Sequence, residues 1–199
     1  MGNFLFLTGN SGEGKTTLLF ECLKPLHESM GGFYTQRLIN EAGSTMGFRM
    51  VPASEEWAPK APYKKGLSNV FMEQTEGGFQ KNLEVFETVG TEILLSSVNT
   101  RLCLMDEIGG IELAVPGFIK AVLDCMDHHV PCIGVLKSRR NLAAMSSRIP
   151  VLPEADQKRV ELEAEIMKRA GGQVHLFERA KTETVRGFIL DFLKENTEK

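Results

Sequence analysis

Short apolar runs alternate with segments in which apolar residues recur at helical spacing, and this alternation continues along most of the chain. Apolar runs typical of strands occupy residues 3–8, 101–105, 130–136 and 173–177. Helical spacing occupies residues 15–30, 84–99, 116–129, 155–169 and 181–195. The alternation predicts an α/β fold in which a mostly parallel sheet is covered by helices on both faces.

Residues 33–51 depart from this alternation, because two β-type runs enclose the turn-rich pentapeptide 40–44. A β-hairpin is predicted here, as an insertion into the parallel sheet. A second pair of short strands is expected at 67–72 and 79–83, on either side of two glycines.

Residues 52–66 contain three prolines and show no periodicity, so a loop with solvated lysines is predicted. The loop carries Trp57, the only tryptophan of the chain. Trp57 has two interpretations: an anchor that packs the loop, or an aromatic ring that stacks on a nucleobase.

The segment between the first strand and the first helix matches the phosphate-binding pattern G-x-x-x-x-G-K-[ST]. It comprises Gly9, Asn10, Ser11, Gly12, Glu13, Gly14, Lys15 and Thr16. Glycines let the main chain curl so that successive N–H groups point at phosphate oxygens. Lys15 adds a charge for the β- and γ-phosphates, Thr16 offers a hydroxyl to Mg²⁺, and the following helix presents its positive end. This P-loop predicts binding of a nucleoside triphosphate; an ordinary glycine-rich turn gives the pattern by chance in roughly one such chain in a hundred.

The helix after the P-loop is expected to end at Gly31-Gly32. Pro25 lies inside this span and should kink or shorten the helix, because proline cannot donate the helical hydrogen bond.

Asp106 and Glu107 follow the apolar run 101–105, at the same edge of the sheet as the P-loop. An acidic residue there can hold Mg²⁺ from the side opposite Thr16, which predicts a metal ligand in Asp106. Glu107 has two interpretations: it orients and deprotonates an attacking water, or it caps a turn. The neighbouring P-loop favours catalysis.

Residues 137–153 carry four cations and no acidic residue: Lys137, Arg139, Arg140 and Arg148. Charge developing in a phosphoryl-transfer transition state calls for a cation beyond Lys15 and Mg²⁺. We hypothesise that Arg139 and Arg140 supply it from a mobile basic lid over 137–148. A solvated surface loop is the alternative.

Composition narrows the classes of partner. The chain has 23 Lys and Arg against 26 Asp and Glu, so its net charge of −3 gives no indication of a nucleic-acid or membrane partner. Its 199 residues suit one domain, 1–199. The sequence enters a strand directly and has no apolar run of about 20 residues, so a cytoplasmic location is expected. The oligomeric state stays open, with a monomer among the options.

The cysteines form no C-x-x-C pair and the histidines are scattered, so buried free thiols are expected and a zinc site is not. The cysteines are Cys22, Cys103, Cys125 and Cys132.

Three blocks of residues together resemble the cancer-related, or thermophile-type, nucleoside-triphosphatase family. The blocks are residues 7–18 around the P-loop, Gly32-Phe33-Tyr34-Thr35 with Gly47-Phe48 after a turn, and Met105-Asp106-Glu107-Ile108-Gly109 through Glu112-Leu113. They occur in the family's order and cover about the first two thirds of the chain. The last third resembles the family only in its pattern of strands and helices.

This resemblance implies a RecA-like P-loop fold and Mg²⁺-dependent hydrolysis of ATP, GTP and other nucleoside triphosphates, with little preference for the base. It also implies that Gly9 to Thr17 bind phosphates, Asp106 binds Mg²⁺ and Glu107 activates water. Two segments depart from the family pattern: Gln36-Arg37-Leu38-Ile39, and Lys137 with the basic stretch after it. They concern base recognition and the lid and leave the phosphate and metal ligands intact.

Two other functions are compatible with these motifs. A P-loop kinase of a nucleoside or small metabolite would transfer the phosphate to an acceptor in place of water. A nucleotide-dependent switch would use the hairpin 33–51 as a partner surface. The adjacent acidic pair Asp106-Glu107 favours hydrolysis, because one carboxylate can hold the metal while the other activates water.

Overall fold

The computed structural model describes residues 3–147, 149, 153–169 and 171–197. Its centre is a β-sheet with the strand order β6-β5-β3-β2-β7-β8-β1-β9, and β4 pairs with β2 outside this path. The strands are β1 Phe4–Thr8, β2 Met30–Ile39, β3 Thr45–Pro52, β4 Lys60–Pro62, β5 Val70–Thr75, β6 Gly78–Lys81, β7 Leu102–Ile108, β8 Cys132–Leu136 and β9 Gln173–Leu176.

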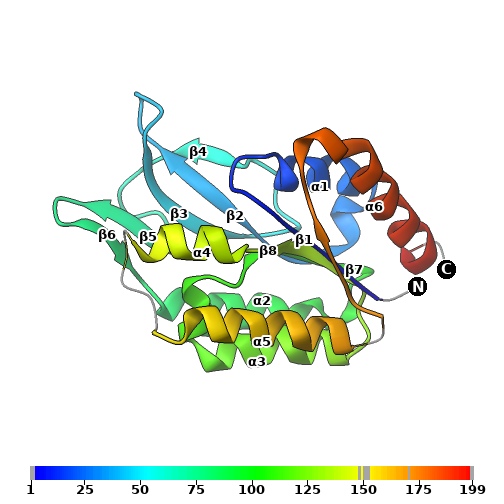
Figure 1. The fold of residues 1–199 in the computed structure, drawn as a ribbon. Helices are drawn as coiled ribbons and strands as arrows, with labels where there is room; N and C mark the ends of the chain where they lie inside the picture. The colour runs from blue at the N-terminus through cyan, green and yellow to red at the C-terminus, as the bar shows by residue number, and fades with distance from the viewer. Residues whose placement is uncertain (1–2, 148, 150–152, 170, 198–199) are drawn as a thin grey trace.

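The sheet has a parallel half and an antiparallel half. Strands β2, β7, β8, β1 and β9 run parallel to their neighbours in that order. Beyond β2 the sheet continues through the antiparallel pairs β2–β3, β3–β5 and β5–β6. The hairpin predicted at 33–51 and the second pair of short strands are therefore confirmed, and they project together at one end of the molecule (Figure 1).

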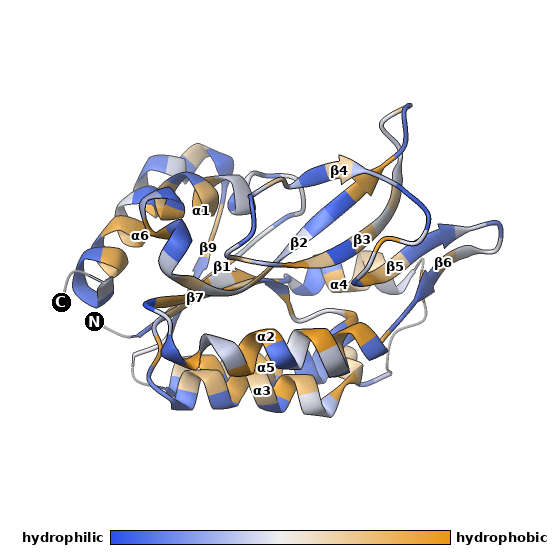
Figure 2. Ribbon diagram, turned by 180° about the vertical axis from the view of Figure 1, so that it is seen from behind, coloured by the Kyte–Doolittle hydropathy of each residue, from blue (hydrophilic) through white to orange (hydrophobic). Residues whose placement is uncertain are grey.

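Helices cover both faces of the parallel half, as predicted. In Figure 1, α1 and α6 lie on one side of the sheet and α2, α3 and α5 on the other. The helices are α1 Lys15–Leu23, α2 Thr91–Ser96, α3 Pro116–Asp127, α4 Arg139–Ser146, α5 Ala155–Lys168 and α6 Thr182–Thr197. Polar and apolar residues alternate around α2, α3 and α5 (Figure 2), as expected for helices that bury one side only.

The strand period of two divides the core into two clusters. Phe4 and Phe6 of β1 pack in the cluster that includes residues of α3 and α5. Leu5 and Leu7 point to the opposite face and pack with residues of α1 and α6. Successive side chains of a strand point to opposite faces, so a strand without polar interruptions serves both clusters. This explains why the central strands are apolar runs.

Gly31 and Gly32 differ from their predicted role. They lie inside β2, and the helix before them ends at Leu23, followed by the 3₁₀ segment η1 Lys24–Ser29 with Pro25 in its first turn. Gly32 has φ +85°, and a Cβ atom there would lie 1.9 Å from the carbonyl oxygen of Leu104. Gly32 therefore allows close approach of β7, whereas a Cβ atom at Gly31 would meet the Ser97 side chain at 2.5 Å. Sequence alone does not separate these roles from a helix stop.

Three further segments have more structure than predicted. Residues 137–153 contain the helix α4, and the loop 52–66 contains β4. The helix predicted over 84–99 is divided into a π-turn η2 Phe86–Gly90, the helix α2 and a 3₁₀ turn η3 Ser97–Asn99. The remaining 3₁₀ segments are η4 Ile111–Ala114 and η5 Arg179–Lys181. In the described part of the chain, no helix has the length and apolar character needed to cross a bilayer.

The four cysteines are free and buried, as predicted. Three of them converge: the sulfur atoms of Cys103, Cys125 and Cys132 lie within 4.8 Å of one another. Register explains part of this, because Cys103 of β7 and Cys132 of β8 are direct neighbours in the sheet. The spacing of the cysteines along the sequence does not reveal this cluster of thiols. The prediction against a zinc site was based on that spacing and therefore did not consider the cluster.

Candidate active site

The P-loop connects β1 to α1 and takes a conformation that requires glycine. Gly9, Gly12 and Gly14 have φ angles of +142°, +78° and +106°. Residues with a Cβ atom rarely adopt such angles. No side chain caps the start of α1, which leaves its first main-chain N–H groups directed at the loop. The loop therefore forms the anion-binding end of a helix.

Lys15 is buried at the start of α1 and its ammonium lies within the curl of the loop. Its Nζ donates hydrogen bonds to the carbonyl oxygens of Gly9, at 3.2 Å, and Asn10. Burial lowers the pKa of Lys15, and the carboxylates of Glu107, Glu13 and Asp106 oppose this effect. The Lys15 ammonium is thus placed where a bound polyphosphate would exchange main-chain partners for charged ones.

Asp106 joins three segments that are distant in sequence. The Thr16 hydroxyl donates to its Oδ1 at 2.9 Å, and the main-chain N–H of Thr35 donates to its Oδ2 at 3.3 Å. Asp106 is buried. Burial and the neighbouring Glu107 carboxylate raise its pKa to about 7, although the two hydrogen bonds act in the opposite direction. The structure thus joins the P-loop to the acidic pair, as predicted.

The donor set at Thr16 and Asp106 fits Mg²⁺. A hydroxyl and a carboxylate are the hard oxygen ligands that this ion prefers, and few protein ligands suffice because phosphate oxygens and waters complete its shell. A fully buried carboxylate with a raised pKa also gains from a nearby divalent charge. Thr16 and Asp106 are therefore the residues that would hold the metal.

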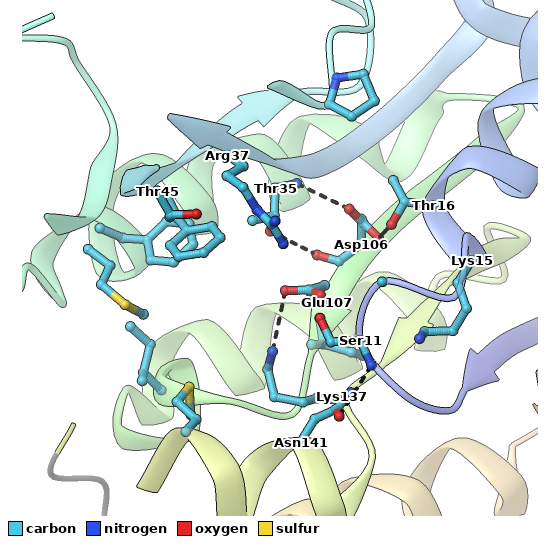
Figure 3. A pocket seen from close by; sticks show the side chains of 18 of the residues that line it. Ser11, Lys15, Thr16, Thr35, Arg37, Thr45, Asp106, Glu107, Lys137 and Asn141 are labelled. Atoms are coloured by element: carbon cyan, nitrogen blue, oxygen red, sulfur yellow. Dashed lines mark hydrogen bonds and ion pairs between the residues drawn. The ribbon is translucent and has the colours of Figure 1, made fainter. Parts of the chain in front are cut away.

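Glu107 has an unusual main-chain conformation, with φ +66°. The pairing of β7 with β8 shifts register between Met105 and Ile108, so the strand is irregular at this point. Left-handed φ angles are costly for residues other than glycine and cluster at functional sites. The irregularity directs the Glu107 side chain into the cavity beside the P-loop (Figure 3).

Lys137 lies opposite Glu107 at the end of β8. Its Nζ donates to Glu107 Oε2 at 3.3 Å. The Lys137 charge lowers the pKa of Glu107, against the effect of burial. Burial alone would lower the pKa of Lys137, but Glu107 and Glu112 outweigh it and raise this pKa. Near neutral pH, Glu107 is therefore a carboxylate and Lys137 an ammonium.

The structure does not bring Arg139 and Arg140 to the phosphate site. They begin α4 with exposed side chains, and neither lines the cavity. Arg139 makes two hydrogen bonds with Asp156 of α5, at 2.8 and 2.5 Å. Its counter-charge thus comes from outside the basic stretch, and helix α4 replaces the predicted loop. Arg148, the last cation of the proposed lid, lies outside the described residues.

Asn141 connects α4 to the P-loop. Its Nδ2 donates to the carbonyl oxygen of Gly9 at 2.9 Å, and its Oδ1 accepts from the N–H of Ser11 at 3.3 Å. Ser138 caps the helix by accepting from the N–H of Asn141. The basic segment therefore contacts the phosphate loop through an amide, and its charged residue at the site is Lys137.

One cavity of about 790 Å³ contains these groups. At one end it is lined by the P-loop, Asp106, Glu107 and Lys137, and at the other by apolar side chains of β3, β5 and β6, including Phe48 and Phe79. Figure 3 shows Glu107 between Lys15 on one side and Thr45 on the other.

Residues 4–167 match the model of the NTPase family. The chain belongs to this nucleoside-triphosphatase family. Nucleoside-triphosphatase THEP1 of Saccharolobus solfataricus is 31% identical over 168 residues, which cover 80% of this chain and 89% of the relative. The cancer-related nucleoside-triphosphatase homolog of Mus musculus is 33% identical over 130 residues, covering 61% and 68%.

Two solved structures have the same fold. The crystal structure of THEP1 from Aquifex aeolicus gives a TM-score of 0.59 at 22% identity and covers 98% of this chain and 99% of the other. The solution structure of a human cancer-related nucleoside triphosphatase gives 0.59 at 22% identity, covering 96% and 97%. These likenesses confirm the predicted P-loop NTPase fold.

The structure gives a physical role to three residues whose contacts the sequence alone did not show. Thr35 of the G-F-Y-T block donates to Asp106 through its main chain. Glu112 is buried and accepts hydrogen bonds from the N–H groups of Gly109 and Gly110, which fixes the turn after Glu107. Lys137 directly follows a predicted strand, as Asp106 does. This position at the carboxyl end of a strand was the feature of the sequence that could have identified Lys137 as a site residue.

Trp57 takes the packing role. Its indole N–H donates to the carbonyl oxygen of Ala53 at 2.7 Å, and its ring stacks on Phe20 with centroids 4.5 Å apart. Trp57 is not among the residues that line the cavity.

Proposed function

We propose that this chain is a Mg²⁺-dependent nucleoside triphosphatase that hydrolyses ATP, GTP and other nucleoside triphosphates to the diphosphate and phosphate. One observation carries the proposal. The Thr16 hydroxyl and the Asp106 carboxylate meet at 2.9 Å, and the next residue, Glu107, faces Lys137 in the adjoining cavity. These contacts support a single site in which the P-loop binds phosphate, Thr16 and Asp106 hold the metal and Glu107 is the base.

The P-loop holds the substrate by its phosphates. Main-chain N–H groups of the loop and the start of α1 bind phosphate oxygens, and the Lys15 ammonium moves from main-chain carbonyls to the β- and γ-phosphates. Thr16 and Asp106 would hold Mg²⁺, which would supply positive charge against the negative charge that develops on the phosphate oxygens.

Glu107 accepts the proton of the attacking water. Its carboxylate is ionised because Lys137 lowers its pKa, and a positioned carboxylate contributes by orienting the water as much as by basicity. Lys137 then has a second role, because an ammonium at this position also stabilises negative charge on the transferred phosphoryl group. It replaces Arg139 and Arg140 as the proposed cation.

We expect little preference for the nucleobase, because the proposed contacts are with the phosphates of the nucleotide. The N–H groups of the P-loop and the Lys15 ammonium bind phosphates and do not distinguish one base from another. The relatives are likewise named for nucleoside triphosphates, with no base specified.

Phosphate release from ATP, GTP, CTP and UTP, each with Mg²⁺ and with EDTA, tests the proposal. We expect turnover of all four within about tenfold of one another, and loss of all four with EDTA or in Lys15→Ala. Turnover of a single nucleotide would contradict broad base use, and turnover that persists in EDTA would contradict the metal.

A further inference from the structure

The cavity is not confined to the P-loop and the acidic pair, and part of its lining is apolar. Its far end is lined by Phe48 of β3, Phe71 and Met72 of β5, Phe79 of β6 and Met145 of α4. The rings form a continuous wall: Phe48 and Phe71 have centroids 6.4 Å apart at 21°, and Phe71 and Phe86 have centroids 4.9 Å apart. We call this end the aromatic chamber.

The P-loop determines which end of a nucleotide faces the aromatic chamber. Loop N–H groups bind the α- and β-phosphates, Lys15 reaches the β- and γ-phosphates, and Thr16 with Asp106 would hold Mg²⁺. The γ-phosphorus therefore lies nearest Glu107, and the nucleoside extends away along the start of α1. Thr45 lies beyond Glu107, on the side away from Lys15 (Figure 3), and the residues of the aromatic chamber line the same cavity.

In-line displacement requires the nucleophile to approach the γ-phosphorus from the side opposite the β–γ bridging oxygen. With the nucleotide in the orientation described above, that side would face Thr45 and the apolar residues of the chamber, which line the same cavity. Cavities of about 300–1,000 Å³ with apolar and aromatic lining are typical of small-molecule sites, and this cavity of about 790 Å³ includes both the nucleotide site and the aromatic chamber. Burying the apolar surface of a ligand in the chamber is favourable.

Two polar groups stand where the chamber meets the phosphate end. The Arg37 guanidinium lies over the Phe48 ring, 5.8 Å from its centroid, and also lowers the pKa of Glu107. Thr45 adds a hydroxyl on the chamber side. An apolar wall bordered by the Arg37 guanidinium and the Thr45 hydroxyl is suited to bind a planar, uncharged molecule that carries its own hydroxyl group.

We propose that the aromatic chamber binds an organic phosphoryl acceptor, a hydroxyl-bearing molecule with a planar apolar body of about nucleoside size, and that the enzyme phosphorylates it. The inference rests on the proposed function, since both reactions use the same phosphate and metal ligands. Water reacts in the same position when no acceptor is bound.

The transfer balances without another reactant. The acceptor hydroxyl oxygen forms a bond to the γ-phosphorus, and the bond from the γ-phosphorus to the β–γ bridging oxygen breaks. The hydroxyl proton passes to the Glu107 carboxylate, and the electron pair of the broken bond stays on the nucleoside diphosphate. The products are a phosphate monoester and the diphosphate.

The test is partitioning of the γ-phosphoryl group between water and an added alcohol. ATP labelled in the γ-phosphate is incubated with enzyme, Mg²⁺ and one probe: adenosine, cytidine, uridine, guanosine or pyridoxine. Ribose and glycerol are the controls without a planar body. We expect labelled monoester with at least one planar probe and none with the controls. Free phosphate alone with every planar probe would overturn the proposal.

Phe79→Ala tests whether the chamber is responsible. Phe79 lines the cavity, whereas its neighbour Gln80 is exposed and does not, so Gln80→Ala is the matched control. We expect Phe79→Ala to lower the ratio of monoester to phosphate at least tenfold, and Gln80→Ala to leave that ratio within about twofold of the parent. An unchanged ratio would overturn the assignment to the chamber.

Two further measurements distinguish an acceptor site from a nucleobase site, and a failure of this proposal from a failure of the proposed function. A productive planar probe should bind in the presence of saturating non-hydrolysable ATP analogue; if the analogue displaces it, the chamber binds the nucleobase and the proposal is wrong. Phosphate release without a probe reports on the proposed function independently. An enzyme that hydrolyses ATP but forms no ester refutes the acceptor alone, and one that does neither refutes both.

Discussion

Lys137 and Glu107 illustrate how two residues in the described site determine each other's charge. The charge of neither residue can be predicted from the sequence, because the two are 30 residues apart and meet only where β7 and β8 end. The carboxylate keeps the buried ammonium charged, and the ammonium keeps the carboxylate ionised. Removing either member changes the protonation of the other.

Lys137→Met should lower kcat by about 10- to 100-fold, because it removes a cation from the transferred phosphoryl group. The pKa of Glu107 should rise without its partner, so the acidic limb of the pH–rate profile should move to higher pH. Arg139→Ala is the control and should change kcat less than twofold, since its side chain pairs with Asp156 at the surface. A loss with Arg139→Ala as large as that with Lys137→Met would restore the lid hypothesis.

Asp106→Asn should alter the pH dependence of stability in metal-free protein. The folded-state pKa of about 7 lies above the usual 3.8, so the folded state binds more protons than the unfolded state between these values. The parent therefore loses stability as pH rises through this window, and the variant does not. Relative to the parent, the variant should gain about 2 kcal/mol between pH 5 and pH 8.

Chemical denaturation in EDTA at both pH values measures this gain. Asp124→Asn, which alters an exposed carboxylate that pairs with Lys120, is the control. Parallel stabilities of parent and Asp106→Asn across the two pH values would show that the pKa of Asp106 is not raised.

Secondary structure was predicted best from the sequence in segments where apolar residues follow one spacing, that of a strand or that of a helix. The central strands, α3, α5 and α6 were predicted from apolar spacing, and each helix buries part of its apolar residues, although Phe188 of α6 is exposed. Helix α4 was missed because Leu142 is its only buried residue, so no apolar stripe marks it. Its position depends on Asn141, whose two hydrogen bonds to the P-loop have no signature in sequence.

Gly32→Ala tests the reassigned glycines of β2. An added Cβ would meet the carbonyl oxygen of Leu104 at 1.9 Å in a main chain with φ +85°, so we expect a loss of at least about 3 kcal/mol of stability. Gly117→Ala in α3 meets no atom within 4 Å and is the matched control. Equal unfolding free energies for the two variants, measured by denaturant titration, would refute the close approach.

For the whole molecule, the fold class and the meeting of the P-loop with the acidic pair were predictable, because the carboxyl ends of parallel strands share one edge. The strand order was not, nor was the aromatic chamber. That chamber is formed by residues of β3, β5 and β6, which the two hairpins bring beside the end of β7. Local patterns specify which residues form strands, whereas pairing between distant segments decides what those strands enclose.

The central claim is that Glu107 activates the nucleophile in a site whose other parts bind nucleotide and metal. Single-turnover phosphate release by Glu107→Gln, measured together with its affinity for a non-hydrolysable ATP analogue, tests this claim most directly. We predict that release slows by about 100-fold or more while affinity stays within about threefold, because the amide keeps the shape of the side chain and loses the base. Release at close to the parent rate, with affinity unchanged, would contradict the account.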